Sequence, residues 1–376
     1  MRLASISLPR KRESREGAHD ADGRHKRGDD QSKHIASAKA LSMATTDTPS
    51  VADRTRHIAA GAPVVGAYFL KSGAVFVLGD EALLFVTGNA EPRRVVVHDG
   101  AILTAASDRE RIVTGGDDGK VVAAKPDMTT TTIAVDPKHR WIDHVAIAPD
   151  GAVAWSAGRD AYVQSRSGGP HKLEAPSTVG GLAFAPKGRR LAIAHYNGVT
   201  LWFPNAPDAA PERLEWKGSH VGVIFSPDGR YLVTAMQEPA LHGWRLTDGK
   251  HMRMSGYATK VQAMAWTADG KGLATSGAPQ LVVWSFHGKD GPMGKEPRVL
   301  VPAEHQVSTV ACHPQKDVIA AGYEDGLVLL VRATDGAEVL ARRPAGSPVS
   351  ALAWNAKGTA VAFGTEEGDA GIVDLA

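Results

Sequence analysis

The stretch Ile224–Gly229 reads Ile-Phe-Ser-Pro-Asp-Gly and decides how the rest of this sequence is interpreted. Proline fixes its own φ angle, the aspartate side chain can bond to nearby backbone, and glycine accepts a positive φ, so Pro-Asp-Gly predicts a tight turn. Short apolar runs flank this turn on both sides, as is typical of β-strands. The stretch therefore predicts two antiparallel strands joined by a turn.

The same pattern recurs along the chain at a nearly constant interval. Clear copies stand at residues 146–151, 183–188, 265–270 and 353–358, and weaker copies at 69–73, 105–110 and 312–316. With the residue before each turn as origin, the eight copies start at 69, 105, 147, 184, 225, 266, 312 and 354, which are 36 to 46 residues apart. A repeat of about 40 residues is typical of the blades of a β-propeller.

Each copy carries the same further elements. The second apolar run ends at another turn, and all units but the one with Ala278 place an acidic or amide residue there: Asp80, Asp118, Asp160, Asn197, Glu238, Asp325 and Glu367. A third apolar run follows, as in residues 280–286. No longer window shows a helical period. The units therefore predict short antiparallel strands and an all-β fold.

The strand count predicts how the ring closes. A fourth strand precedes every unit except the first, as in residues 94–97, whereas the last unit stops at Ala376 directly after its third strand. The unpaired segment at about 55–60 can supply the missing strand, which removes two free sheet edges. We expect residues 54–376 to form one eight-bladed β-propeller of four-stranded antiparallel blades closed in this way, with a seven-bladed ring as the alternative.

These features resemble the WD-repeat β-propeller family. The Phe-Ser-Pro-Asp-Gly turn and the acidic second turn match its pattern, and a Trp follows the second turn by six residues at Trp244 and Trp284 and by five at Trp202. The Gly-His pair of the family is reduced to remnants at 219–220 and 304–305. The resemblance implies a WD-repeat propeller over residues 54–376.

The N-terminal residues 1–53 differ in composition from the rest. Residues 1–42 hold ten Lys/Arg and six Asp/Glu, a charge of +4, with few bulky apolar side chains, so we expect a disordered basic extension. It could be an arm for an acidic partner, a targeting presequence, or a segment without function. Met43 could be the true start of the protein.

A search for reactive motifs predicts no catalytic residue, cofactor or metal. Residues 115–120 read Gly-Gly-Asp-Asp-Gly-Lys, which does not have the spacing of a phosphate-binding loop. Cys312 takes a position filled by Phe or Trp in other units, which indicates a small buried hydrophobic residue, and a single cysteine excludes an internal disulfide. The cluster His139–His144 favours a polar loop over a metal site. The runs 205–211 and 287–297 are interpreted as insertions, either solvated or used to grip a partner.

One face of such a propeller collects the turns between second and third strands and the loops that enter each unit. We expect this face to bind a partner, because aromatic and Arg side chains dominate interface hot spots. The candidate residues are Trp141, Arg159, Tyr196, His220, Tyr257, Lys260, His305 and Tyr323.

The leading functional prediction is a non-catalytic scaffold or adaptor that binds proteins. The alternative is a propeller enzyme or small-ligand binder, of hydrolase or lactonase type, that uses the central channel and requires carboxylates or histidines at its mouth. A net charge of +2 argues against nucleic acid as the partner, and the lack of an apolar stretch of about 18–20 residues argues against a membrane. One free thiol and no export signal predict a cytoplasmic protein.

Overall fold

The structure is a computed structural model, and it describes residues 48–206 and 209–376. Within these residues the chain is built from thirty β-strands and a single 3-10 turn, Ala52–Arg54. The all-β prediction is therefore confirmed. The predictions made for residues 1–42 and for Met43 lie outside the described residues.

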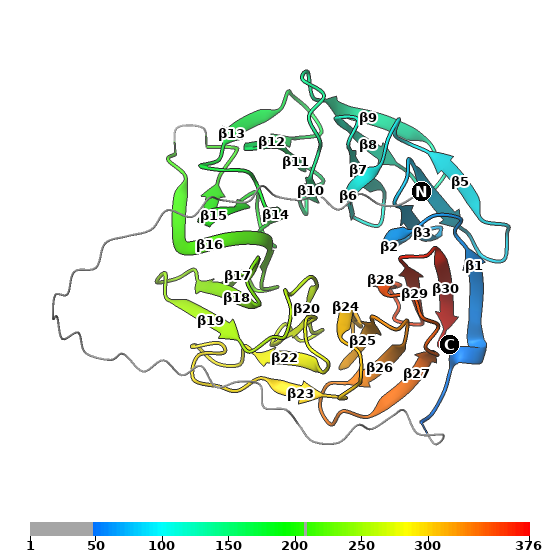
Figure 1. Ribbon diagram of the computed structural model, residues 1–376. Helices are drawn as coiled ribbons and strands as arrows, with labels where there is room; N and C mark the ends of the chain where they lie inside the picture. Colours follow the sequence, from blue (N-terminus) through cyan, green and yellow to red (C-terminus); the bar gives the residue numbers. More distant parts are fainter. Residues whose placement is uncertain (1–47, 207–208) are drawn as a thin grey trace, which may run out of the picture. The chain divides into compact units, whose positions relative to one another are not determined.

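The strands form seven hydrogen-bonded sheets arranged around a centre (Figure 1). Six sheets have four antiparallel strands each: β2 (Val64–Leu70), β3 (Gly73–Leu78), β4 (Ala82–Val86) and β5 (Arg93–Val96); β6 (Ile102–Ser107), β7 (Ile112–Gly116), β8 (Lys120–Ala124) and β9 (Thr130–Val135); β10 (His144–Ile147), β11 (Val153–Ala157), β12 (Asp160–Gln164) and β13 (His171–Glu174); β20 (Met264–Trp266), β21 (Gly272–Thr275), β22 (Leu281–Ser285) and β23 (Arg298–Leu300); β24 (Val307–Cys312), β25 (Val318–Tyr323), β26 (Val328–Arg332) and β27 (Glu338–Arg342); β28 (Val349–Trp354), β29 (Ala360–Thr365), β30 (Asp369–Asp374) and β1 (Thr55–Ala59).

The seventh sheet has six strands, and two of them are unusually long. Its members are β14 (Gly181–Phe184), β15 (Leu191–Trp202), β16 (Glu212–Phe225), β17 (Tyr231–Met236), β18 (Ala240–Arg245) and β19 (His251–Ser255). The first half of β16 pairs with β15, and its second half pairs with β17. The strand is therefore shared between two sequence units.

Strand β15 turns back on itself. Five residues of extended chain span roughly 16 Å, which His and Thr side chains cannot bridge. His195 Nε2 nevertheless lies 2.9 Å from Thr200 Oγ1, and Asn197 between them has φ of 67°. The chain therefore reverses here, and β15 supplies both the second and the third strand of its unit.

The number of blades in the ring depends on whether hydrogen-bonded sheets or sequence units are counted. Counted as hydrogen-bonded sheets there are seven, which agrees with the seven-bladed alternative. Counted as sequence units there are eight, because the units that turn after residues 184 and 225 share the six-stranded sheet. The repeat predicted from the sequence and the observed sheets are thus consistent.

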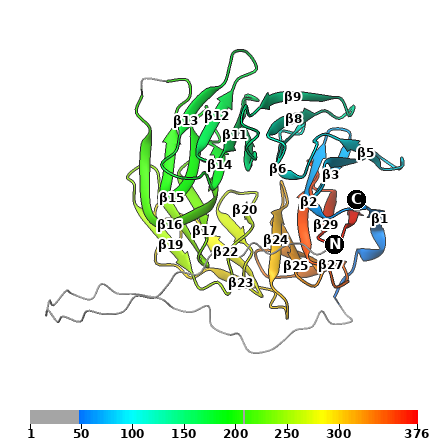
Figure 2. The ribbon, with the colours of Figure 1, turned by 45° about the horizontal axis from the view of Figure 1, so that its top comes forward.

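The predicted closing strand is confirmed. β1 pairs antiparallel with β30, so that Thr55 lies opposite Val373 and Ile58 opposite Ala370. Both views place β1 beside the C-terminal strands (Figures 1 and 2). Just ahead of β1, the Leu340 amide donates to the Pro49 carbonyl at 2.8 Å, and the Val51 amide donates to the Leu340 carbonyl at 2.9 Å. The N-terminal segment therefore contacts two neighbouring sheets, through β27 and β30.

Neighbouring sheets pack through close contacts at glycine. A Cβ atom on Gly364 of β29 would lie 2.3 Å from Val64 Cγ1, and one on Gly322 of β25 would lie 2.7 Å from the Val349 side chain. In both cases the residue that fills the space begins the first strand of the next unit. Glycine at this position thus lets adjacent sheets approach each other.

Among the described residues, no helix is long and apolar enough to cross a membrane.

The closing strand generates a stability prediction. Ile58 is buried in the cluster that also contains Val64 and Ala370, whereas His57 beside it is exposed. We expect Ile58→Ala to lower the free energy of unfolding by about 2–5 kcal/mol through lost burial and a cavity. His57→Ala should change it by less than about 0.5 kcal/mol. Chemical denaturation of both variants measures the difference. Equally small effects of the two substitutions on the free energy of unfolding would contradict a stabilising role for the pairing of β1 with β30.

Candidate functional site

Four of the eight candidate residues are exposed on the expected face. Trp141 and Tyr196 are each 58% exposed, and Arg159 and His305 are also exposed. Lys260 is partly buried. These residues lie on turns between second and third strands or on loops that enter a unit, as the sequence predicts.

The other three, His220, Tyr257 and Tyr323, are buried. Tyr257 lies between strands of its own sheet, where its hydroxyl is 2.8 Å from Thr275 Oγ1 and accepts a hydrogen bond of 2.6 Å from Trp284 Nε1. Burial raises the pKa of this tyrosine. Its side chain caps its own unit and does not reach the face.

His220 and Tyr323 are held in a comparable way. His220 Nε2 donates to the Trp216 carbonyl at 3.0 Å, and its Nδ1 lies 2.7 Å from Thr234 Oγ1. The Tyr323 hydroxyl donates to the Val301 carbonyl at 3.4 Å. Neither side chain is available to a partner at the surface.

His98 is a further buried histidine with structural hydrogen bonds, and it is not among the residues singled out from the sequence. Its Nδ1 donates to Asp118 Oδ1 at 3.0 Å, and its Nε2 lies 2.8 Å from Thr114 Oγ1. Burial raises the pKa of Asp118, but hydrogen bonds from the Asp99 and Lys120 amides and from His98 outweigh it and hold that pKa below its usual value. The signal in the sequence was the run Val-His-Asp-Gly at 97–100, just ahead of β6.

The loop that carries Trp141 is fixed by an ion-pair network. The neighbouring Arg140 bonds to Asp136 at 2.7 Å and to Asp160 at 3.0 Å. The Asp136 carboxylate also accepts the backbone N–H of Lys138 and of Arg140, both at 3.0 Å. The hydrogen bond with Asp136 raises the pKa of Arg140, so the guanidinium stays charged. The exposed indole therefore stands on a rigid loop.

The turn that carries Tyr196 is fixed as well. The Tyr196 amide donates to Ser177 Oγ at 2.9 Å, and its carbonyl accepts from His195 Nδ1 at 2.9 Å. Burial lowers the pKa of His195, which favours the neutral ring. Asn197 Oδ1 accepts from the Gly218 amide at 3.2 Å. The phenol ring is thus presented from an ordered turn.

Two aliphatic side chains on the same face distinguish one sector of the ring. Strands β2, β6, β24 and β28 each begin with a register shift, and the extra residue is Val65, Leu103, Ser308 and Ser350 respectively. Ser308 Oγ donates to the Val349 carbonyl at 2.6 Å, and Ser350 makes the same kind of bond to the next unit. Val65 and Leu103 have no hydroxyl group and cannot form this hydrogen bond to the next unit. Both side chains remain exposed.

The innermost strands offer little chemistry. In Figure 1 the strands nearest the centre are β2, β6, β10, β14, the second half of β16, β20, β24 and β28, and none of these stretches contains Asp or Glu. Within the described ranges, no three His, Cys, Asp or Glu side chains are grouped so that they could hold a metal ion. Burial raises the pKa of Cys312 to about 12, so its thiol stays protonated. Burial also lowers the pKa of His144, while His139 is exposed.

A cluster of aromatic and histidine rings lies in the six-stranded sheet. His242 is 0% exposed, and neither of its ring nitrogens has a hydrogen-bond partner among residues 48–206 and 209–376. Its ring stacks on Trp216 at a centroid distance of 4.0 Å and on His251 at 5.3 Å. Burial, together with repulsion from His251 and His220, lowers the pKa of His242 to about 3.

The fold and this face together define a β-propeller with a rigid aromatic surface. The family described as the anaphase-promoting complex subunit 4 WD40 domain matches residues 310–376. Protein HIR1 of Chaetomium globosum is 29% identical over 140 aligned residues, covering 27% of this chain and 13% of that protein, so the chain spans only a small part of its length. These two matches support the resemblance to the WD-repeat β-propeller family that the sequence pattern indicates.

Two solved structures share the fold. The computationally designed Ika8 protein superposes with a TM-score of 0.68 at 17% identity, covering 83% of this chain and 96% of its own. The RRP9 WD40 repeats superpose with a TM-score of 0.57 at 15% identity, covering 78% of this chain and 100% of theirs. At these identities the likeness concerns the fold alone.

The buried tyrosine gives a second stability prediction. Tyr257→Phe removes the hydroxyl that satisfies the Trp284 N–H, and an unsatisfied buried donor costs about 1–3 kcal/mol. We expect that loss in the free energy of unfolding. Tyr196→Phe, which changes an exposed phenol, should have an effect below about 0.5 kcal/mol. Equal effects of the two changes in denaturant titrations would contradict the structural assignment of Tyr257.

The buried imidazole predicts acid sensitivity. Because the pKa of His242 is lower in the folded state than the ordinary value of 6.5, the unfolded chain binds more protons on acidification. Its share of stability is complete above pH 6.5 and decreases as the pH falls toward 3, by about 3 kcal/mol at pH 4. We expect His242→Phe to flatten the pH dependence of the unfolding free energy by that amount. Parallel profiles for wild type and His242→Phe would contradict this.

Proposed function

We propose that the chain is a non-catalytic scaffold that binds a protein partner through the face bearing Trp141 and Tyr196. The observation that carries the proposal is that both aromatic side chains are 58% exposed although hydrogen-bonded turns hold them in place. WD40 propellers commonly serve as protein-interaction scaffolds. We propose the cytoplasm as the site of action, and a protein rather than nucleic acid or a membrane as the partner.

Physical chemistry favours such a surface for binding. Trp, Tyr and Arg are enriched among the residues that contribute most to interface affinity. A surface that is already ordered loses little conformational entropy on association, so more of the contact energy appears as affinity. The exposed Val65 and Leu103 extend the apolar part of this face. The innermost strands, which lack carboxylates, support the scaffold over an enzyme of the central channel.

Removal of the two aromatic rings tests the proposal. We expect Trp141→Ala with Tyr196→Ala to weaken partner binding at least tenfold, because each hot-spot truncation costs about 2 kcal/mol or more. Phe203→Ala is the matched control, since Phe203 is exposed and follows the far end of the β15 hairpin from Tyr196. Proteins co-purified from the native host with each full-length variant provide the measurement. A partner set that is unchanged in the double variant would disprove the role of this face.

A further inference from the structure

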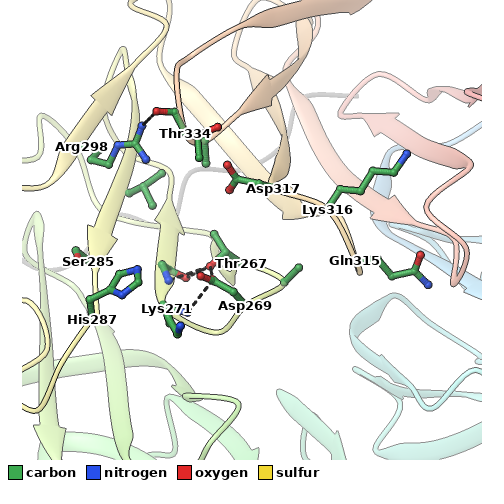
Figure 3. Close-up of a pocket in the computed structure, with 14 residues that line it drawn as sticks. Thr267, Asp269, Lys271, Ser285, His287, Arg298, Gln315, Lys316, Asp317 and Thr334 are labelled. Atoms are coloured by element: carbon green, nitrogen blue, oxygen red, sulfur yellow. Dashed lines mark hydrogen bonds between the residues drawn. The ribbon is translucent and has the colours of Figure 1, made fainter.

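A pocket lies at the opposite end of the strands from Trp141 and Tyr196. It has a volume of about 550 Å³ and lies between the sheets β20–β23 and β24–β27. Its walls come from the turns between first and second strands of both units and from the end of β22, the start of β23 and the turn after β26. Figure 3 shows Arg298 and Asp317 on upper walls of this space, with His287 and the turn Thr267–Lys271 below them.

The corresponding gap on the other side of β20–β23 is occupied by the chain itself. The insertion 287–297 packs against the preceding unit, where the Tyr231 hydroxyl donates to the Lys289 carbonyl at 2.9 Å and Arg245 pairs with Asp290 at 2.9 Å. The unit of β24–β27 has only a short turn after β26, at residues 333–337. No corresponding loop from the described part of the chain covers this pocket.

The floor of the pocket is a rigid turn. Thr267 Oγ1 donates to Asp269 Oδ1 at 2.6 Å, and the Lys271 amide donates to the same oxygen at 3.0 Å. The Gly272 amide donates to Thr267 Oγ1 at 2.9 Å. Burial acts against ionisation of Asp269, but these hydrogen bonds outweigh it and lower its pKa. Its Oδ1 is thus used within the turn.

The cationic side chains around the pocket form no ion pair with its carboxylates among the described residues. Lys271, Arg298 and Lys316 line it, and His287 adds a further ring. Over the described part of the chain, Lys271 and Lys316 form no side-chain ion pair or hydrogen bond, and Arg298 donates only to the Thr334 carbonyl. Lys271, Arg298 and Lys316 line the pocket together with the carboxylates of Asp269 and Asp317, so the charged groups of its lining carry a net charge of +1. The excess positive charge attracts an anion.

We propose that this pocket binds an acidic peptide segment, with a carboxylate of the peptide placed between Lys271 and Arg298. The volume lies within the range of pockets that hold organic ligands and exceeds what a lone oxyanion fills. Asp317 and Ser285 offer acceptors for N–H groups of the peptide backbone. Ala268, Val283 and Ala333 supply apolar wall. This site goes beyond the proposed function, since it uses a different face of the propeller.

Fluorescence anisotropy of a labelled hexaglutamate peptide with the full-length protein tests the proposal. We expect Lys271→Ala with Arg298→Ala to weaken binding at least fivefold, and Ser285→Trp to weaken it similarly by filling the pocket without a change of charge. Lys187→Ala with Lys357→Ala is the matched control, because both lysines are exposed in the same turn of other units. The control should retain affinity within twofold. Binding contributed by the N-terminal basic residues is common to all variants.

Three results would overturn the proposal. The first is equal loss of affinity in the pocket and control variants, which would indicate a general charge effect. The second is equal binding of a hexaglutamine peptide, which would show that the carboxylates are not recognised. The third is binding of inorganic phosphate that depends on Lys271 while hexaglutamate does not bind, which would indicate a small-anion site. Trp141→Ala with Tyr196→Ala should leave hexaglutamate binding unchanged, so this test is independent of the scaffold proposal.

Discussion

The pairing of β1 with β30 is the constraint on which the rest of the ring depends. Without it, the last sheet would have three strands and an open edge, and an unpaired edge invites association with other chains. The contact joins Thr55 to Val373, which are separated by most of the folded chain. The entropy cost of closing a loop grows only with the logarithm of its length, so one strand pairing and its buried Ile58 can stabilise a ring of this size.

The architecture was predictable because its signals are local. A turn such as Ser226–Gly229 depends on the backbone preferences of its own residues, and repetition of that turn fixed the period. The sharing of one sheet by two sequence units was harder to predict from the sequence. β16 passes from one unit into the next without Pro or a turn sequence, and only Gly218, with φ of 108°, marks where it bends. Whether such a bend interrupts the ladder depends on tertiary pairing.

The binding face was only partly predictable, since it depends on burial. Trp141 and Tyr257 both lie in loops that enter a unit, yet one is exposed and the other is buried against Thr275 and Trp284. The direction of each side chain is set by partners on distant strands, which sequence spacing does not reveal. His98 was missed for the same reason, because its role appears only when Asp118 and Thr114 are brought to it.

The pairing of β1 with β30 also constrains when the ring can close during synthesis of the chain. β1 leaves the ribosome about 310 residues before β30, a delay of roughly 15–60 s at 5–20 residues per second. During that time its partner strand does not yet exist, and Ile58 has no sheet to enter. The nascent chain must therefore keep this strand from pairing elsewhere until translation is nearly complete, and ring closure is a late step of biogenesis.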